Sequence, residues 1–215
     1  MSSKLFFMEC LNENCRFRFP LDLDSFKGKI CPQCGSELRK ATERLAQWQP
    51  GGFQSDHLEF IILLDNIRSA HNVGSIFRTC EGADVNKVIL CGLTPTPQNN
   101  RSVIKAALGA ENRLDWEWAA NSLQMTAALK AEGYKVVILE CLPEALNLFE
   151  VKPESLSGDK LLVLLGSEPA GVDPGLLNLA DLCIYIPMAG EKSSLNVSVA
   201  CGIAVYELRN ILRER

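Results

Sequence analysis

Short apolar runs alternate with segments of helical spacing along most of this chain. Strands are predicted at Phe60–Leu64, Lys87–Cys91, Leu114–Trp118, Lys135–Glu140, Leu161–Leu165 and Leu182–Ile186. Helices are predicted between and after them, over Val73–Ala83, Ser102–Leu108, Ser122–Glu132 and Leu195–Arg213. Continuous apolar strands that alternate with helices are typical of a parallel sheet covered on both faces. The pattern therefore predicts an α/β domain with a mainly parallel sheet.

The first fifty residues have a different pattern. Polar and turn-forming residues surround four cysteines, and a helix is predicted over Ser36–Trp48. The turn-rich sequence Gln49-Pro50-Gly51-Gly52 follows this helix and is typical of a break between folded units. We therefore expect two domains, a small one over residues 1–50 and a larger one over residues 51–215.

Composition limits the class of protein. Of 215 residues, 47% are hydrophobic and 22% are charged, as in ordinary globular proteins. The apolar runs are too short to cross a bilayer, and the N-terminus does not resemble a signal peptide, so we expect a cytoplasmic protein without a membrane partner. A net charge of −4 argues against unspecific coating of nucleic acid. Residues 66–113 nevertheless carry six basic and three acidic side chains, which form either solvated helix faces or a local RNA-binding patch.

The nine cysteines fall into two groups. Cys10, Cys15, Cys31 and Cys34 form two closely spaced pairs, which is the spacing of a structural zinc site with four thiolate ligands. Four unrelated cysteines, or a redox pair at Cys31 and Cys34, are the alternatives. Aromatic and cationic side chains alternate beside this site, which suggests a role in docking RNA; they are Arg16, Phe17, Arg18 and Phe19. The remaining cysteines lie among apolar residues and are expected to be small core side chains; they are Cys80, Cys91, Cys141, Cys183 and Cys201.

Three segments place polar residues at the carboxyl ends of predicted strands, the edge at which α/β sheets bind ligands. They are Asn72-x-Gly-x3-Arg78, Gly166-x-Glu168-x2-Gly171 and Ile186-Pro-Met188 followed by Ser194-Leu-Asn196-Val-Ser198. Each has a simple structural explanation when taken singly. Asn72 suits a helix N-cap, the glycines suit turns, and Ser194 with Asn196 suits the cap of the last helix. No glycine-rich dinucleotide or phosphate-binding loop is present.

Taken together and in this order, the three segments resemble the motifs of the SpoU (TrmH-like) RNA 2′-O-ribose methyltransferases. The resemblance extends from about Leu58 to the C-terminus and leaves out the cysteine-rich segment. It implies a C-terminal trefoil knot, which sequence pattern alone would not predict because knots are nearly absent from proteins. It also implies a homodimer whose site is completed by the partner subunit. The knot of the family binds S-adenosylmethionine largely through backbone groups, which correspond here to Leu165, Gly166, Ile186, Met188 and Leu195.

The same resemblance suggests which residues carry the chemistry. Arg78 corresponds to the essential arginine of the family. A guanidinium loses its proton only at a pH of about 12 or above, so we expect Arg78 to clamp phosphate and developing alkoxide rather than to act as a base. Asn72, Ser194 and Asn196 are expected to orient the ribose and Arg78, and Glu168 to fix the knot loop or a partner arginine. Methylation of a base, or RNA binding without catalysis, are the alternative functions. The choice between tRNA and rRNA stays open.

Overall fold

The computed structural model describes residues 5–25, 28–45, 58–192 and 194–213. The chain divides into two compact units, Met1–Gly52 and Phe53–Arg215, and each is described by itself. The predicted break at Gln49–Gly52 lies outside the described residues.

The first unit is a small antiparallel sheet. Its strands are β1 (Leu5–Cys10), β2 (Arg18–Asp22) and β3 (Leu38–Glu43), in the order β2-β1-β3. The helix predicted over Ser36–Trp48 is wrong over the length of β3, and its last three residues lie outside the described part of the chain. Cys10 pairs with Leu38 at the end of the β1–β3 ladder, so cross-strand hydrogen bonding outweighs the weak helical preference of this segment.

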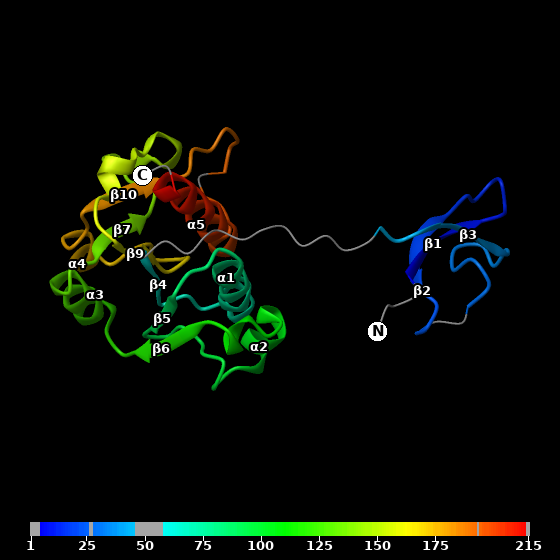
Figure 1. Ribbon diagram of the computed structural model, residues 1–215, viewed down its shortest axis with the longest axis horizontal. Coiled ribbons are helices and arrows are strands. Elements are labelled where there is room, and N and C mark those ends of the chain that lie inside the picture. The colour runs from blue at the N-terminus through cyan, green and yellow to red at the C-terminus, as the bar shows by residue number, and fades with distance from the viewer. Residues whose placement is uncertain (1–4, 26–27, 46–57, 193, 214–215) are drawn as a thin grey trace. The chain divides into compact units, whose positions relative to one another are not determined.

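The second unit contains a seven-stranded sheet in which every pair is parallel. Its strands follow the order β6-β5-β4-β9-β7-β10-β8 (Figure 1). Their bounds are β4 Glu59–Asp65, β5 Lys87–Cys91, β6 Asp115–Ala119, β7 Lys135–Leu139, β8 Leu146–Asn147, β9 Lys160–Leu165 and β10 Leu182–Tyr185. The α/β class predicted from the sequence is confirmed.

Helices cover both faces of this sheet (Figure 1). They are α1 Ala70–Gly82, α2 Arg101–Ala107, α3 Ser122–Ala131, α4 Pro174–Leu177 and α5 Val197–Arg213, with 3₁₀ turns at Ala110–Asn112, Leu148–Glu150 and Pro153–Leu156. Successive side chains of a strand point to opposite faces. Ile62 and Leu64 of β4 accordingly pack in the core beneath α1, α2 and α5, whereas Ile61 and Leu63 pack in the core beneath α3 and α4.

The sequence pattern locates six of these strands and four of these helices with small shifts at their ends. Strand β8 and helix α4 were not predicted, because two and four residues are too short to produce a periodic signal. Cys80, Cys91 and Cys201 are buried as expected, whereas Cys183 is only partly buried. The prediction for Cys141 is wrong, because this cysteine follows the end of β7 and is exposed.

Strand β10 lies between β7 and β8, although both precede it in the sequence. Ile184 of β10 pairs with Leu139 at the end of β7 and with Leu146 at the start of β8. The six-residue connection 140–145 therefore passes across the carboxyl end of β10.

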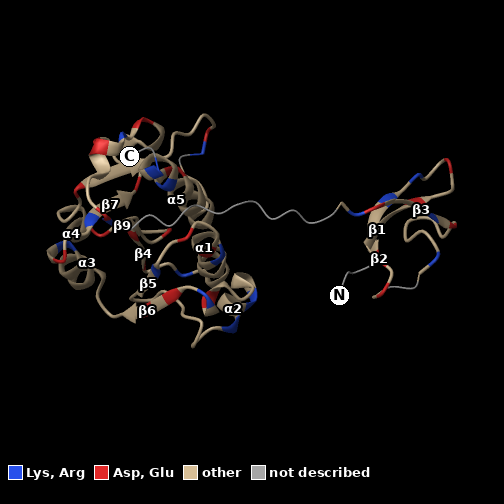
Figure 2. Ribbon diagram, in the orientation of Figure 1, with Lys and Arg blue, Asp and Glu red and all other residues tan. Residues whose placement is uncertain are grey.

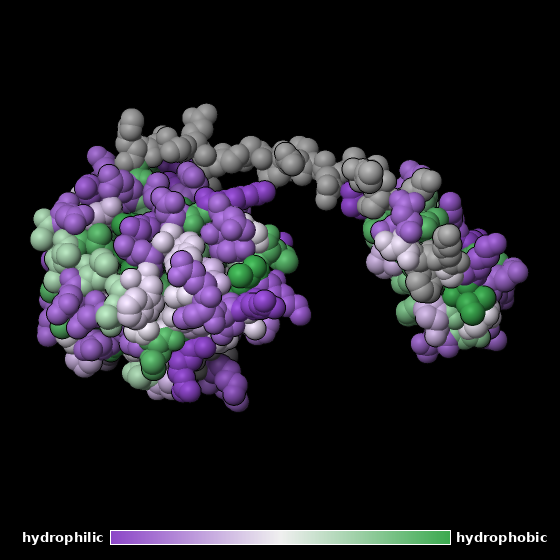
Figure 3. Space-filling view, turned by 90° about the horizontal axis from the view of Figure 1, so that it is seen from below, coloured by the Kyte–Doolittle hydropathy of each residue, from purple (hydrophilic) through white to green (hydrophobic). Residues whose placement is uncertain are grey.

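The surface of the second unit is mixed in character. Hydrophobic residues form several separate groups among hydrophilic ones on the face seen in Figure 3. Within the described residues, none of the helices combines the length and the apolar character that a membrane span requires.

Candidate functional site

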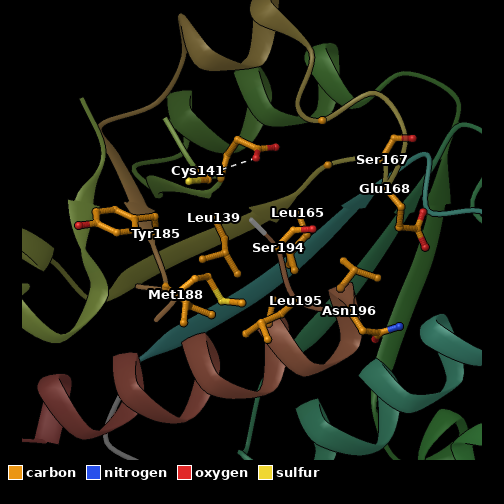
Figure 4. Close-up of a pocket in the computed structure, with 16 residues that line it drawn as sticks. Leu139, Cys141, Leu165, Ser167, Glu168, Tyr185, Met188, Ser194, Leu195 and Asn196 are labelled. Carbon is orange, nitrogen blue, oxygen red and sulfur yellow. Dashed lines mark hydrogen bonds between the residues drawn. The ribbon is translucent and has the colours of Figure 1, made fainter. Parts of the chain in front are cut away.

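A pocket of about 310 Å³ opens at the carboxyl ends of β7, β9 and β10, beside the N-terminus of α5 (Figure 4). Apolar side chains and backbone line one part of it, and hydroxyl, amide and carboxylate groups line the rest. The lining residues are Leu139, Glu140, Cys141, Leu165, Gly166, Ser167, Glu168, Gly171, Tyr185, Ile186, Met188, Ser194, Leu195, Asn196, Val197 and Ala200. The carboxyl edge of the sheet therefore holds the pocket, as the strand pattern predicts.

Most of the residues singled out in the sequence lie at this pocket. All five of the residues expected to contact a cofactor line it, namely Leu165, Gly166, Ile186, Met188 and Leu195. Glu168, Ser194 and Asn196 line it as well. The second and third sequence segments thus form its walls.

The first segment joins this pocket through hydrogen bonds. Asn72 donates from Nδ2 to Oε1 of Glu168 over 3.0 Å, and Oδ1 of Asn72 accepts from Nδ2 of Asn196 over 3.1 Å. Oδ1 of Asn196 in turn accepts from the hydroxyl of Ser198 over 2.6 Å. A single amide side chain therefore links the two segments that form the pocket walls.

Asn72 is not the helix cap that its position suggested. The N-cap of α1 is Ser69, whose hydroxyl accepts from the backbone N–H of Asn72 at 3.3 Å. Because Ser69 fills the capping position, the amide of Asn72 is available for Glu168 and Asn196. Asn196 does cap the last helix, since its Oδ1 accepts from the backbone N–H of Ser198 at 2.9 Å.

Two glycines shape the turn after β9. A Cβ added at Gly166 would lie 2.6 Å from the carbonyl oxygen of Gly171 and 2.6 Å from a methyl of Val172, so no side chain fits there. Gly171 has a φ of +72°, a left-handed conformation that favours glycine. Ser167 and Gly171 exchange backbone hydrogen bonds of 3.1 and 2.8 Å, which close the turn. The backbones of Gly166 and Gly171 therefore approach each other closely, and both glycines line the pocket.

Arg78 lies apart from the pocket within one chain. It is exposed on α1 and is absent from the pocket lining. Among the described residues, no hydrogen bond or ion pair holds its guanidinium. The structure therefore brings together every catalytic candidate except Arg78.

The polar lining residues that sequence reasoning missed include Glu140, Ser167 and Tyr185. Glu140 follows the last residue of β7, and its Oε1 accepts from the backbone N–H of Cys141 at 2.9 Å. A polar residue at the end of an apolar strand was the signal used for the other segments, and it also identifies Glu140. Tyr185 ends β10 and carries no comparable signal.

Burial changes the pKa of Asp65, a carboxyl group in the stretch of chain that precedes Asn72. Asp65 ends β4 and is 3% exposed, and its burial raises its pKa above the ordinary value. It accepts a hydrogen bond from the side chain of Asn66 at 2.8 Å. Asp65 is thus part of the structure beneath the first segment, and it is not part of the pocket lining.

The four N-terminal cysteines form one cluster in the first unit. Their sulfur atoms all lie within 4.8 Å of one another, with Cys10 and Cys34 at 3.5 Å and Cys15 and Cys31 at 3.9 Å. Thiolates around a tetrahedral zinc with bonds of about 2.3 Å would be about 3.8 Å apart. Burial raises the pKa of Cys10 to about 12, and hydrogen bonding with Ser36 lowers the pKa of Cys34 to about 6.

The aromatic and cationic residues beside these cysteines separate into two groups. The rings of Phe17 and Phe19 lie 5.2 Å apart. Arg18 instead contacts both other strands of the sheet, with hydrogen bonds to Glu9 of β1 at 3.4 Å and to Thr42 of β3 at 3.3 Å. The exposed Arg18 guanidinium thus lies over the sheet.

Residues 59–206 match the model of the SpoU rRNA Methylase family. The chain belongs to this family. The match covers the parallel sheet, all three motif segments and most of α5, and it leaves out the cysteine-rich unit. It confirms the resemblance inferred from the motifs.

Two curated relatives illustrate the similarity. The 23S rRNA (guanosine-2′-O-)-methyltransferase RlmB of Acinetobacter baylyi is 30% identical over 72% of this chain and 60% of its own length. The tRNA (guanosine(18)-2′-O)-methyltransferase of Aquifex aeolicus is 30% identical over 73% of this chain and 72% of its own. The chain therefore spans about three fifths of the first relative and most of the second.

Solved structures share the fold. The TrmH/SpoU tRNA modifying enzyme of A. aeolicus has a TM-score of 0.63 and 30% identity, covering 73% of this chain and 76% of its own. An AdoMet-bound rRNA methyltransferase from Sinorhizobium meliloti has a TM-score of 0.65 and 28% identity, covering 72% of this chain and 57% of its own.

Proposed function

We propose that this chain transfers a methyl group from S-adenosylmethionine to a ribose 2′-hydroxyl of tRNA or rRNA. The observation that carries the proposal is the convergence of the three family segments on one pocket, linked by the hydrogen bonds of Asn72. The names of the relatives support an RNA ribose as the acceptor. We further propose that it acts in the cytoplasm, where tRNA and rRNA are abundant substrates.

The pocket fits S-adenosylmethionine in size and chemistry. Its volume of about 310 Å³ lies within the range of small-molecule sites. Leu139, Leu165 and Leu195 offer an apolar surface for an adenine ring, and the exposed backbone at Gly166 offers donors and acceptors for its edge. The two lining carboxylates, Glu140 and Glu168, suit a ligand with a net positive charge.

The protein's part in the reaction is alignment and electrostatic stabilisation. The bound sulfonium supplies an already activated methyl group. Ser194, Asn196 and Asn72 would orient the ribose so that its 2′-oxygen could reach the methyl group of the bound donor. Glu168 holds Asn72 in place. The proton of the hydroxyl passes to a phosphate oxygen or to water. Arg78 does not take it, because a guanidinium keeps its own proton up to a pH of about 12 and so has no free site to accept another.

We further propose that Arg78 acts in a homodimer, where the partner subunit completes the site. Within one chain Arg78 lies apart from the pocket lining, which fits this proposal.

Helix α5 carries two exposed apolar side chains seven residues apart on one face, Val199 at 50% and Tyr206 at 45% exposure, and we propose this face as the dimer interface. A Val199→Asp variant should be monomeric by light scattering and inactive. A dimer that persists in this variant would exclude this face as the interface.

We propose a trefoil knot for the chain beyond β9. The insertion of β10 between β7 and β8 supports it, because the chain must then pass the connection 140–145 on its way to α5. The threading holds the backbone after β10 beside the loop at Gly166. The knot thereby forms a cofactor site largely from backbone groups.

For the first unit we propose a zinc ribbon that docks RNA. The sulfur distances agree with a tetrahedral four-thiolate site. The exposed Arg18 and Arg39 offer cations for phosphate, and Phe17 offers a ring for base stacking.

In the second unit, a basic surface lies along α1 and α2, where Figure 2 marks Lys and Arg and where Arg78, Arg101 and Lys105 are exposed.

The proposal is tested by incubating purified protein with methyl-labelled S-adenosylmethionine and total RNA from a strain that lacks the gene. Label should enter RNA. Mapping the labelled position would decide between tRNA and rRNA. Absence of transfer to any RNA, from protein that binds the cofactor, would favour an RNA-binding protein without catalysis.

A further inference from the structure

The charges that line the pocket are of one sign. Glu140 and Glu168 are its two carboxylates, and the described lining includes no lysine, arginine or histidine. A partly enclosed site screens charge less than water does, so two such carboxylates make the pocket favourable for cations. The two carboxylates differ in how many of their oxygens the protein already holds by hydrogen bonds.

Glu168 is largely engaged by the protein. Its Oε1 accepts from Asn72 at 3.0 Å, and its Oε2 accepts from the backbone N–H of Arg68 at 3.4 Å. Both oxygens are therefore turned toward the stretch of chain from Arg68 to Asn72. The role of this carboxylate is accounted for by the link between the two loops.

Glu140 is held by one oxygen only. Its Oε1 accepts from the N–H of Cys141, which fixes the direction of the carboxylate. Its Oε2 has no hydrogen-bond partner among the described residues and lies 3.2 Å from the place where a Cβ of Gly171 would stand. Because residue 171 is glycine, no side chain of that residue covers this oxygen, and Glu140 lines the pocket.

We propose that Glu140 makes the pocket prefer the charged methyl donor over its uncharged product. This inference rests on the proposed methyl transfer. S-adenosylmethionine carries a sulfonium, an ammonium and a carboxylate, hence one net positive charge. When the methyl leaves, the electron pair of its bond stays on sulfur, and S-adenosylhomocysteine is neutral overall. A fixed carboxylate stabilises the first ligand and not the second, so Glu140 favours binding of the donor and release of the product.

The test compares ligands by isothermal titration calorimetry on the full chain. S-adenosylmethionine and sinefungin, in which an aminated carbon replaces the methylated sulfur, are the charged ligands, and S-adenosylhomocysteine is the neutral one. In Glu140→Gln we expect affinity for both charged ligands to fall about tenfold, as suits unit charges in a partly buried site. Affinity for S-adenosylhomocysteine should change less than twofold.

Two further variants separate this effect from misfolding. Glu140→Asp keeps the charge and should recover most of the preference for the donor. Glu144→Gln removes the same charge from the same connection, at an exposed residue outside the pocket lining, and should leave all three affinities unchanged. Raising the salt concentration should reduce the difference in affinity between the charged ligands and S-adenosylhomocysteine in the wild type. It should have little effect on that difference in Glu140→Gln.

Equal weakening of all three ligands in Glu140→Gln would overturn the inference, because Glu140 would then hold a group that donor and product share. Unchanged affinities would overturn it as well. A wild-type protein that binds none of the ligands would contradict the proposed function itself, which is a different result from binding without charge preference.

Discussion

Asn72 donates a hydrogen bond to Glu168 over 3.0 Å, although 96 residues separate them in the sequence. They meet because β4 and β9 are adjacent parallel strands, so the loops that follow them leave the sheet at the same edge. The same amide accepts from Asn196, 124 residues further along. The three sequence segments therefore act as one site.

We expect Asn72→Ala to reduce methyl transfer by about 10²-fold, since misplacing a positioned group by about 1 Å has this order of effect. Its affinity for S-adenosylmethionine should hardly change, because Asn72 does not line the pocket. Asn210→Ala, an exposed asparagine near the end of α5, is the matched control and should keep full activity. A large loss of cofactor affinity in Asn72→Ala would contradict a role in orienting the ribose.

Gly166→Ala should abolish cofactor binding. Its Cβ would lie 2.6 Å from the carbonyl of Gly171, so the loop that lines the pocket must move. Gly190→Ala is the control, because no atom lies within 4 Å of a Cβ built there and its φ is not in the left-handed region. Calorimetry with S-adenosylmethionine distinguishes the two. Comparable binding by both variants would mean that this loop is not part of the cofactor site.

The purified protein should contain about one zinc per chain. Cys31→Ser should lose the metal and unfold the first unit, since a sheet this small buries too little surface to fold without it. The second unit should keep its melting transition, because its core contains none of these cysteines. Metal analysis and amide hydrogen exchange measure both effects. Zinc-free protein with a protected first unit would show that the cysteines do not bind metal.

Arg78→Ala should lose about 10²–10³-fold in rate, the usual cost of removing one transition-state donor. Arg78→Lys should keep a small residual rate, because it retains the charge but not the planar pair of donors. Cofactor affinity should be unaltered in both.

The pH profile of Arg78→Lys distinguishes a clamp from a base. A clamp lowers the height of the profile and leaves its shape unchanged. A rise in activity at saturating RNA with a pKa near that of lysine, about 10, would restore the general-base role.

The strand pattern and the three segments were sufficient to predict the parallel sheet and most of the pocket. The link through Asn72 could not be predicted, because Ser69 and Asn72 both suit an N-cap and only the start of α1 decides between them. Strand β3 was mistaken for a helix because its pairing with β1 is a long-range interaction without a local signal. Glu140 carried a usable signal at the end of β7, but it lies outside the three segments.

The chemical position of the transferred methyl group tests the central claim most directly. A 2′-O-methyl group removes the nucleophile of alkaline RNA cleavage, so labelled RNA should give alkali-resistant dinucleotides and, after enzymatic digestion, a 2′-O-methylnucleoside. The same label should be absent with Asn196→Ala, which removes a proposed ribose-orienting group. Label recovered in alkali-sensitive nucleotides that carry a methylated base would contradict ribose methylation, while leaving the family assignment intact.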